Sequence, residues 1–304
     1  MDKLKHLLTL KDLSQAQFLG LLELAKDIKG DPKKYSQALA GKSIVTLYEK
    51  PSLRTRVTFD IGIAKLGGHA LYLDQNNGAL GKRESVEYFA KNISCWADAI
   101  VARTYSHKTV EELAEYGSVP VINSLSDMYH PCQALADFLA LSEQFDDLSK
   151  IKLVYIGDGN NVTHSLMFAA AIAGSDMVVI CPEGCFPDGK VVIDAQVLAM
   201  KHGGSLTLST DLSAAKNADA IYTDTWISMG DSITYEDIKE KFSPYQVNQQ
   251  MMSDLGIDYF MHCQPAHIDQ EVTQEVFDGE QSLVLQQAEN RMHAQNAVMV
   301  TLLT

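Results

Sequence analysis

The chain has 304 residues, 46% of them hydrophobic and 21% charged, which excludes a disordered, collagenous or coiled-coil protein. Its formal net charge of −14 argues against nucleic acid as the main partner, and no apolar run reaches the ~18 residues of a membrane span. Five scattered cysteines without a CxxC pair predict reduced thiols and a cytoplasmic location. At roughly 150 residues per domain, the length predicts two domains.

The first predicted helix begins after Ser14, which has capping-box spacing to Gln17, and it ends at Gly30 and Pro32. Apolar runs then alternate with helical patterns. The first series of expected strands comprises 44–48, 70–73, 99–102 and 119–122, with helices beginning near 52, 84 and 109. After a long predicted helix at 133–145, the second series comprises 152–156, 177–180, 206–208, 220–223 and 259–262, and a last helix is expected at 287–303.

This alternation predicts an α/β fold with two doubly wound parallel-sheet domains and the active site in the cleft between them. The expected first domain comprises 1–131 together with 286–304. The expected second domain is 147–285, and a linking helix at 132–146 joins the two.

Polar residues follow the predicted strands, at the sheet edge where open parallel sheets bind ligands. The segment Glu49–Arg56 brings Ser52, Thr55 and two arginines, Arg54 and Arg56, to the start of a helix. Free backbone N–H groups, the positive end of the helix dipole and guanidinium groups together favour an anion. The alternative is a capped helix with solvated arginines.

Two further strand ends are followed by residues that are candidates for binding a ligand. Arg103 ends an apolar strand, where a charge is unexpected without a partner. His130 and Gln133 flank Pro131 at a predicted helix start and could both reach a ligand there, although a structural role for the histidine is the simpler reading.

Neither a nucleotide cofactor nor a metal is predicted. Gly157-Asp158-Gly159 resembles half of a dinucleotide fingerprint, but Val162 replaces the third glycine and no ribose-binding acid follows the next strand. Cys181 and Cys185 are four residues apart, and no second pair completes a zinc site.

Three later segments also carry candidate site residues, at 223–230, 262–267 and 289–294. Cys263 with a nearby histidine also suggests a thiol nucleophile, but no paired base is evident. Taken together, the motifs place three arginines and a histidine around one cleft, with Asp224 and Cys263 on its other side.

In this order the motifs resemble the aspartate/ornithine carbamoyltransferase family, over residues 4 to 303. They are Ser-x-Arg-Thr-Arg, His-Pro-x-Gln, Asp-Gly-Asn-Asn, Asp-x-Trp-x-Ser-Met-Gly, His-Cys-x-Pro and Glu-Asn-Arg-x-His. The first two are shared with the aspartate enzymes, whereas 224–230 and Cys263 resemble the ornithine type.

The resemblance implies transfer from carbamoyl phosphate to L-ornithine, giving L-citrulline and phosphate, by direct attack of the neutral δ-amine on the carbonyl. It implies no cofactor, a homotrimer, a first domain that binds carbamoyl phosphate and a second that binds ornithine. A role in arginine biosynthesis is also implied, although the residues themselves do not distinguish biosynthetic from catabolic use.

By position, the implied catalytic residues are Arg54, Arg103, His130 and Cys263. The implied carbamoyl phosphate ligands are Ser52, Leu53, Arg54, Thr55, Arg103, His130, Gln133, Cys263, Gln264 and Arg291. The implied ornithine ligands are Asn161, Asp224, Ser228 and Met229.

The chain departs from the family pattern at two places. Gln264 stands where leucine is usual, and its main-chain carbonyl is the expected contact. Ala79 stands where a glutamine often reaches the neighbouring subunit, which leaves Asn77 or Lys82 as the expected crossing residue.

Overall fold

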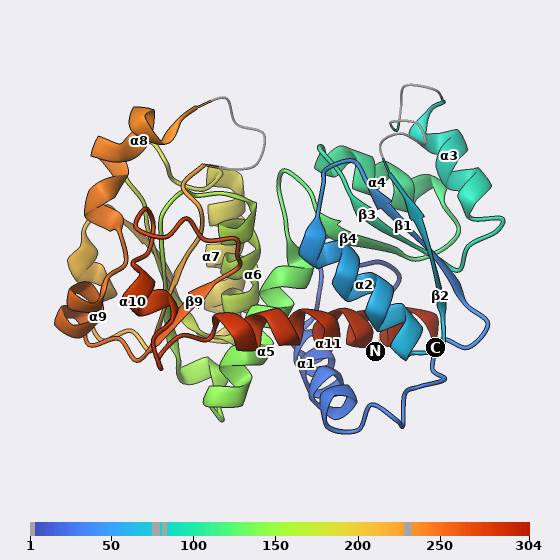
Figure 1. Cartoon of the computed structure of the whole chain (residues 1–304), viewed down its shortest axis with the longest axis horizontal. Coiled ribbons are helices and arrows are strands. Elements are labelled where there is room, and N and C mark those ends of the chain that lie inside the picture. Colours follow the sequence, from blue (N-terminus) through green and yellow to red (C-terminus); the bar gives the residue numbers. More distant parts are fainter. Residues whose placement is uncertain (1–3, 75–79, 81–83, 228–232) are drawn as a thin grey trace. The chain divides into compact units, whose positions relative to one another are not determined.

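The structure, a computed structural model, describes residues 4–74, 80, 84–227 and 233–304. It has two compact units, each with one parallel sheet, so the predicted α/β class with two parallel sheets is confirmed (Figure 1). The first unit comprises Met1–Asp12, Ala16–Leu139 and Asn290–Thr304, and the second comprises Leu13–Gln15 and Ala140–Glu289. The expected domain bounds and the cleft stay predictions.

The first unit is built on a four-stranded sheet of order β2-β1-β3-β4. Its strands are β1 (Ser43–Tyr48), β2 (His69–Leu73), β3 (Ala99–Arg103) and β4 (Val121–Leu125). Its helices are α1 (Gln15–Gly30), α2 (Leu53–Lys65), α3 (Val86–Ile93), α4 (His107–Tyr116), most of α5 (Pro131–Gln144) and the greater part of α11 (Val284–Leu303).

Alternation along the strands separates the two faces of this sheet. Leu47, Ile100 and Ala102 pack with α3 and α4 in one apolar cluster. Tyr48 and Arg103 therefore point to the other face, where the Tyr48 hydroxyl donates to the carbonyl of Thr55 in α2 at 3.4 Å.

The second unit has a five-stranded parallel sheet of order β7-β6-β5-β8-β9. Its strands are β5 (Lys152–Ile156), β6 (Asp176–Ile180), β7 (Leu206–Ser209), β8 (Ala220–Thr223) and β9 (Tyr259–His262). Its helices are α6 (Asn161–Ala173), α7 (Gly189–His202), α8 (Tyr235–Phe242), α9 (Gln249–Leu255) and α10 (Gln274–Phe277), with short 3₁₀ turns at Leu148–Lys150, Leu212–Ala215 and Ser243–Tyr245. One apolar cluster covers a face of the sheet, from Val154 and Ile180 to Phe260.

The predicted strands agree with the structure to within one residue at each end, except for β4, which is expected at 119–122 and found at Val121–Leu125. Strand β4 begins at Val121 and not at 119, because Pro120 has no N–H to add to the ladder. In the part of the chain that the structure describes, no helix is both long and apolar enough to cross a membrane.

Candidate active site

The carboxyl ends of β1 and β3 lie beside each other, and the second of them carries the predicted site residue Arg103. Tyr48 ends β1 and pairs in register with Arg103, which ends β3. Helix α2 begins at Leu53, so Arg54 and Thr55 lie in its first turn, where backbone N–H groups have no intrahelical partner. The sheet edge and the helix start thus offer positive potential to an anion.

The start of α5 lies beyond the carboxyl end of β4 and presents two more predicted residues. The carbonyl of His130 accepts the N–H groups of Gln133 at 3.1 Å and Ala134 at 3.3 Å, so His130 is the residue that precedes the helix. Pro131 takes the first helical position, which needs no N–H.

Arg291 connects these elements from α11. Its Nη2 donates to Thr55 Oγ1 at 3.1 Å, and its Nη1 donates to Gln133 Oε1. We call Thr55, Arg103, His130, Gln133 and Arg291 the anion half-site; all five are buried.

Arg103 carries a buried charge, and the described residues place no counter-charge beside it. Burial, followed by the positive charge of Arg291, lowers its pKa to about 10, so the guanidinium stays protonated at neutral pH. None of the ion pairs within the described residues involves Arg103, and its Nε makes no hydrogen bond there. Two neighbouring buried cations are costly, and a bound dianion would relieve that cost.

His130 is held as a neutral imidazole. Burial, then the charges of Arg291 and Arg103, place its pKa well below 6.5. A neutral imidazole keeps one N–H donor that suits a carbonyl oxygen.

We expect the free energy of unfolding to fall as the pH drops below about 6.5, partly because of His130. Its pKa is lower in the folded chain than in the unfolded one, so acid adds protons preferentially to the unfolded state. This contribution is complete above the unfolded pKa of 6.5 and is lost progressively below it. Urea unfolding across this range should give a shallower pH dependence for His130→Gln than for the wild type, and equal slopes would contradict the assignment.

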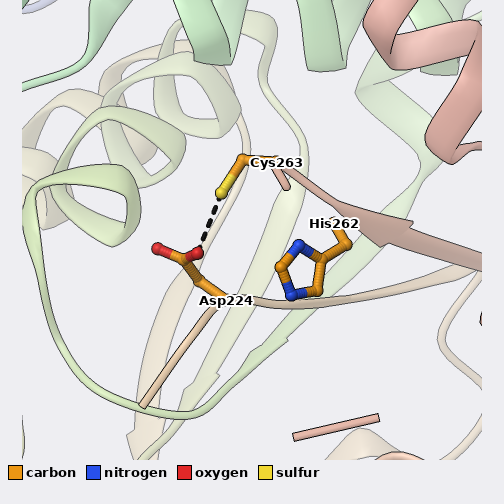
Figure 2. Close-up of side chains that lie close together, drawn as sticks. All are labelled: Asp224, His262 and Cys263. Atoms are coloured by element: carbon orange, nitrogen blue, oxygen red, sulfur yellow. Dashed lines mark hydrogen bonds between the residues drawn. The ribbon is translucent and has the colours of Figure 1, made fainter. Parts of the chain in front are cut away.

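A second cluster of polar side chains follows the strands of the second sheet (Figure 2). Asp224 comes directly after β8, and Cys263 directly after the neighbouring β9. Cys263 Sγ donates to Asp224 Oδ1 at 2.9 Å, and the Thr225 N–H donates to the same oxygen at 2.8 Å. Asn160 Nδ2 donates to Asp224 Oδ2 at 2.9 Å. We call Asp224, Cys263 and Asn160 the carboxylate half-site.

His262, the last residue of β9, supports the turn that follows Cys263. Its Nδ1 accepts the Gln264 N–H at 2.8 Å, so Nε2 carries the proton and donates to the buried Glu271 at 3.2 Å. Glu271 also accepts the His267 N–H at 2.6 Å. Gln264 has a φ of 60°, which is uncommon outside glycine, and these bonds hold it there.

The same region contains a group of potential metal ligands. One atom each of Asp224, His262 and Cys263 lie within 4.8 Å of one another. Both ring nitrogens of His262 are engaged, one as acceptor and one as donor, so a metal would have to displace Gln264 or Glu271. We assign no metal to the cluster.

Two family models cover most of the chain. Residues 5–143 match the aspartate/ornithine carbamoyltransferase carbamoyl-P binding domain, and residues 149–302 match the Asp/Orn binding domain of the same family. The chain belongs to the aspartate/ornithine carbamoyltransferase family. It is therefore a carbamoyltransferase, as the resemblance of its motifs implies.

Relatives of this carbamoyltransferase agree along its whole length. An ornithine carbamoyltransferase of Shewanella oneidensis is 66% identical over 299 residues, which are 98% of this chain and 99% of the relative. The solved ornithine carbamoyltransferase of Pyrococcus furiosus has a TM-score of 0.95 at 45% identity, covering 98% of this chain and 97% of that one. A solved acetylornithine transcarbamylase complexed with acetylcitrulline has a TM-score of 0.89 at 29% identity, covering 99% and 100%. The fold alone therefore does not select the amine substrate.

The structure places the predicted site residues of the carbamoyltransferase as follows. Five form the anion half-site, and Asp224 and Cys263 belong to the carboxylate half-site. Near these lie Ser52, Leu53 and Arg54 at the start of α2, Asn161 at the start of α6 and Gln264 after Cys263. Outside the described residues lie Ser228, Met229, Asn77, Ala79 and Lys82. The ligand assigned to each residue stays a prediction.

Asn160 received no role from the sequence, although it holds Asp224. Its Oδ1 caps α6 by accepting the N–H groups of Val162 and Thr163, and this leaves Nδ2 for the carboxylate. An asparagine before a helix is a capping signal, but a contact 64 residues away is invisible in the sequence.

Gly159 has a packing explanation that needs no nucleotide. A Cβ on Gly159 would lie 2.2 Å from the backbone nitrogen of Pro187, and its N–H donates to the Cys185 carbonyl at 2.8 Å. The glycine therefore allows the segment 185–187 to approach the loop closely.

Proposed function

We propose that the chain is an ornithine carbamoyltransferase, which converts carbamoyl phosphate and L-ornithine to L-citrulline and phosphate. The observation that carries the proposal is the buried guanidinium of Arg103, which has no carboxylate partner among the described residues. The positive charge of Arg291 acts on it and lowers its pKa. The phosphate dianion of carbamoyl phosphate supplies the missing negative charge. The names of the full-length relatives support the same reaction.

The anion half-site binds carbamoyl phosphate in this proposal. Arg54 and the N–H groups that begin α2 hold the phosphate, with Ser52, Leu53 and Thr55. Arg103 and the neutral His130 direct donors at the carbonyl oxygen, where negative charge grows as the tetrahedral centre forms. The carbonyl of Gln264 receives the carbamoyl amino group.

The carboxylate half-site binds ornithine. Asp224 accepts the α-ammonium group, and Asn161 donates to the α-carboxylate together with the segment of Ser228 and Met229. Cys263 lies beside the reacting amine as a thiol. Its Sγ donates to Asp224, and direct attack of the amine needs no covalent bond to the sulfur.

Transfer then proceeds by direct attack of the δ-amine on the carbonyl carbon. The new C–N bond forms, the C–O bond to phosphate breaks, and the proton that the amine loses ends on the released phosphate. Because an alkyl ammonium has a pKa of roughly 10, the neutral amine is a minor species at neutral pH and the rate should rise from about pH 7 to about pH 9. Orientation and electrostatics supply most of the acceleration.

The test is an assay of the purified chain with carbamoyl phosphate and L-ornithine, in which citrulline and phosphate are both measured. We expect the two products in equal amounts, with neither cofactor nor added metal. Phosphate release without citrulline would contradict the proposal.

We also propose a homotrimer, which the family resemblance implies, and an apolar stripe on α2 supports a subunit interface. Leu53, Val57 and Ile61 are exposed at a spacing of four residues, and Leu71 is exposed on the edge strand β2. Contiguous exposed apolar side chains are typical of subunit interfaces. Light scattering should give three times the 33.5 kDa chain mass, and Ile61→Glu should lower it. A fully active monomer would contradict this proposal.

We propose a cytoplasmic location, as the scattered cysteines without a CxxC pair predict. The free state of all five cysteines supports it. The role in arginine biosynthesis also stays a proposal, since a catalyst accelerates both directions of one reaction.

A further inference from the structure

Four side chains of the first unit form a continuous buried chain of hydrogen bonds. Asp137 Oδ1 accepts from Gln133 Nε2 at 2.7 Å, Gln133 Oε1 accepts from Arg291 Nη1, and Arg291 Nη2 donates to Thr55 at 3.1 Å. Asp137 lies one turn beyond Gln133 on α5, with 0% of its surface exposed. The motifs assigned no role to Asp137.

The chemistry of an amide makes the position of Asp137 decisive. The two ends of a glutamine amide differ, because the nitrogen only donates and the oxygen only accepts. A carboxylate at one end of Gln133 fixes the nitrogen there, so the oxygen must face Arg291. Without Asp137 the amide could turn, and its N–H groups would then oppose the N–H groups of the guanidinium.

We propose that Asp137 is a positioning residue for carbamoyl phosphate: it sets the orientation of the Gln133 amide, which in turn fixes Arg291. This inference rests on the proposed function and adds to it a residue that does not itself touch the substrate. Gln133 Nε2 uses one of its two N–H groups for Asp137. The negative charge of Asp137 by itself weakens anion binding, whereas its orientation of Gln133 strengthens it. The two effects on phosphate affinity therefore have opposite signs.

Two substitutions separate the orientation effect from the charge effect. Asp137→Asn removes the charge but keeps an oxygen that can accept from Gln133. Asp137→Leu has a similar size and removes both. We expect Asp137→Leu to raise the KM for carbamoyl phosphate and the Kd of inorganic phosphate by about tenfold, and Asp137→Asn to change them far less.

A paired exchange tests the hydrogen-bond direction itself. Gln133→Glu places two carboxylates together and should weaken phosphate binding about tenfold or more. Gln133→Glu combined with Asp137→Asn restores the pattern, because asparagine now donates to glutamate and glutamate still accepts from Arg291. The combined variant should therefore bind phosphate more tightly than Gln133→Glu alone, although both lack the amide N–H of Gln133, and this comparison holds even if Asp137→Leu does not fold.

The control is Asp98→Asn, since Asp98 accepts from the Ser43 N–H at the opposite end of β1 and should alter the melting temperature without altering phosphate affinity. Phosphate affinity is measured by calorimetry, which needs no turnover. Failure of the proposed function is therefore distinguishable, because the wild-type chain would then form no citrulline whatever its phosphate affinity. Equal effects of Asp137→Leu and Asp137→Asn, or no recovery in the combined variant, would overturn the inference.

Discussion

Arg54→Ala is expected to reduce kcat/KM for carbamoyl transfer by about 10³-fold or more, with the first unit still folded. Arg54 is the second residue of α2 and partly exposed, so its removal leaves no buried cavity. In the proposed site its guanidinium holds the phosphate together with the N–H groups of the helix start. Loss of a fork-shaped donor to a dianion should raise the KM for carbamoyl phosphate and lower kcat together.

Arg56→Ala is the matched control two residues further along α2. Arg56 stacks on Tyr72 at 3.7 Å and lies 3.6 Å from Asp60, so its loss should lower the melting temperature and affect the KM for carbamoyl phosphate much less. Near-normal turnover and substrate affinity in Arg54→Ala would remove Arg54 from the phosphate site.

Asp224→Asn is expected to lower kcat/KM for ornithine by about 10²- to 10³-fold. The described neighbours that bond this carboxylate are all donors: the Cys263 thiol, the Thr225 N–H and the Asn160 amide. Asparagine can accept at one oxygen only, so its own NH₂ group would face a donor. The variant loses both the counter-charge for the α-ammonium group and the geometry that holds it.

Phosphate affinity separates this effect from general damage, because it depends on the anion half-site and should stay unchanged in Asp224→Asn. Asp176→Asn serves as the control carboxylate, since Asp176 begins β6 and bonds Ser205 at 2.6 Å. If Asp224→Asn leaves kcat/KM for ornithine intact, the assignment of Asp224 to the α-amino group is wrong.

The sequence predicts the sheets well because buried parallel strands are short continuous apolar runs. Strands β5, β8 and β9 have the bounds expected from 152–156, 220–223 and 259–262. The sequence predicts helices between the strands of the second series without bounds, and α8, α9 and α10 are the hardest to find because each has at most eight residues and few apolar positions. Contacts with the sheet cluster keep α9 and α10 in place, and ring contacts of Trp226 with Tyr235 and Phe242 hold α8.

The site follows a similar division. Residues directly after strands, such as Arg103 and Asp224, are predictable because parallel topology brings strand ends to one edge. Asp137, Asn160 and Glu271 are not, because each acts through a hydrogen bond to another polar side chain whose direction only the structure defines. The resemblance identifies the first group and is silent about the second.

The most direct test of the central claim is kcat/KM for four amines at saturating carbamoyl phosphate: ornithine, acetylornithine, putrescine and aspartate. Acetylation removes the cation that Asp224 accepts, putrescine lacks the carboxylate, and aspartate has no distal amine. A site built for polar partners rejects analogues that lack them by up to ~10⁴-fold. The account predicts that ornithine exceeds each of the others by at least about 10²-fold. Acetylornithine or putrescine reacting as well as ornithine would contradict it.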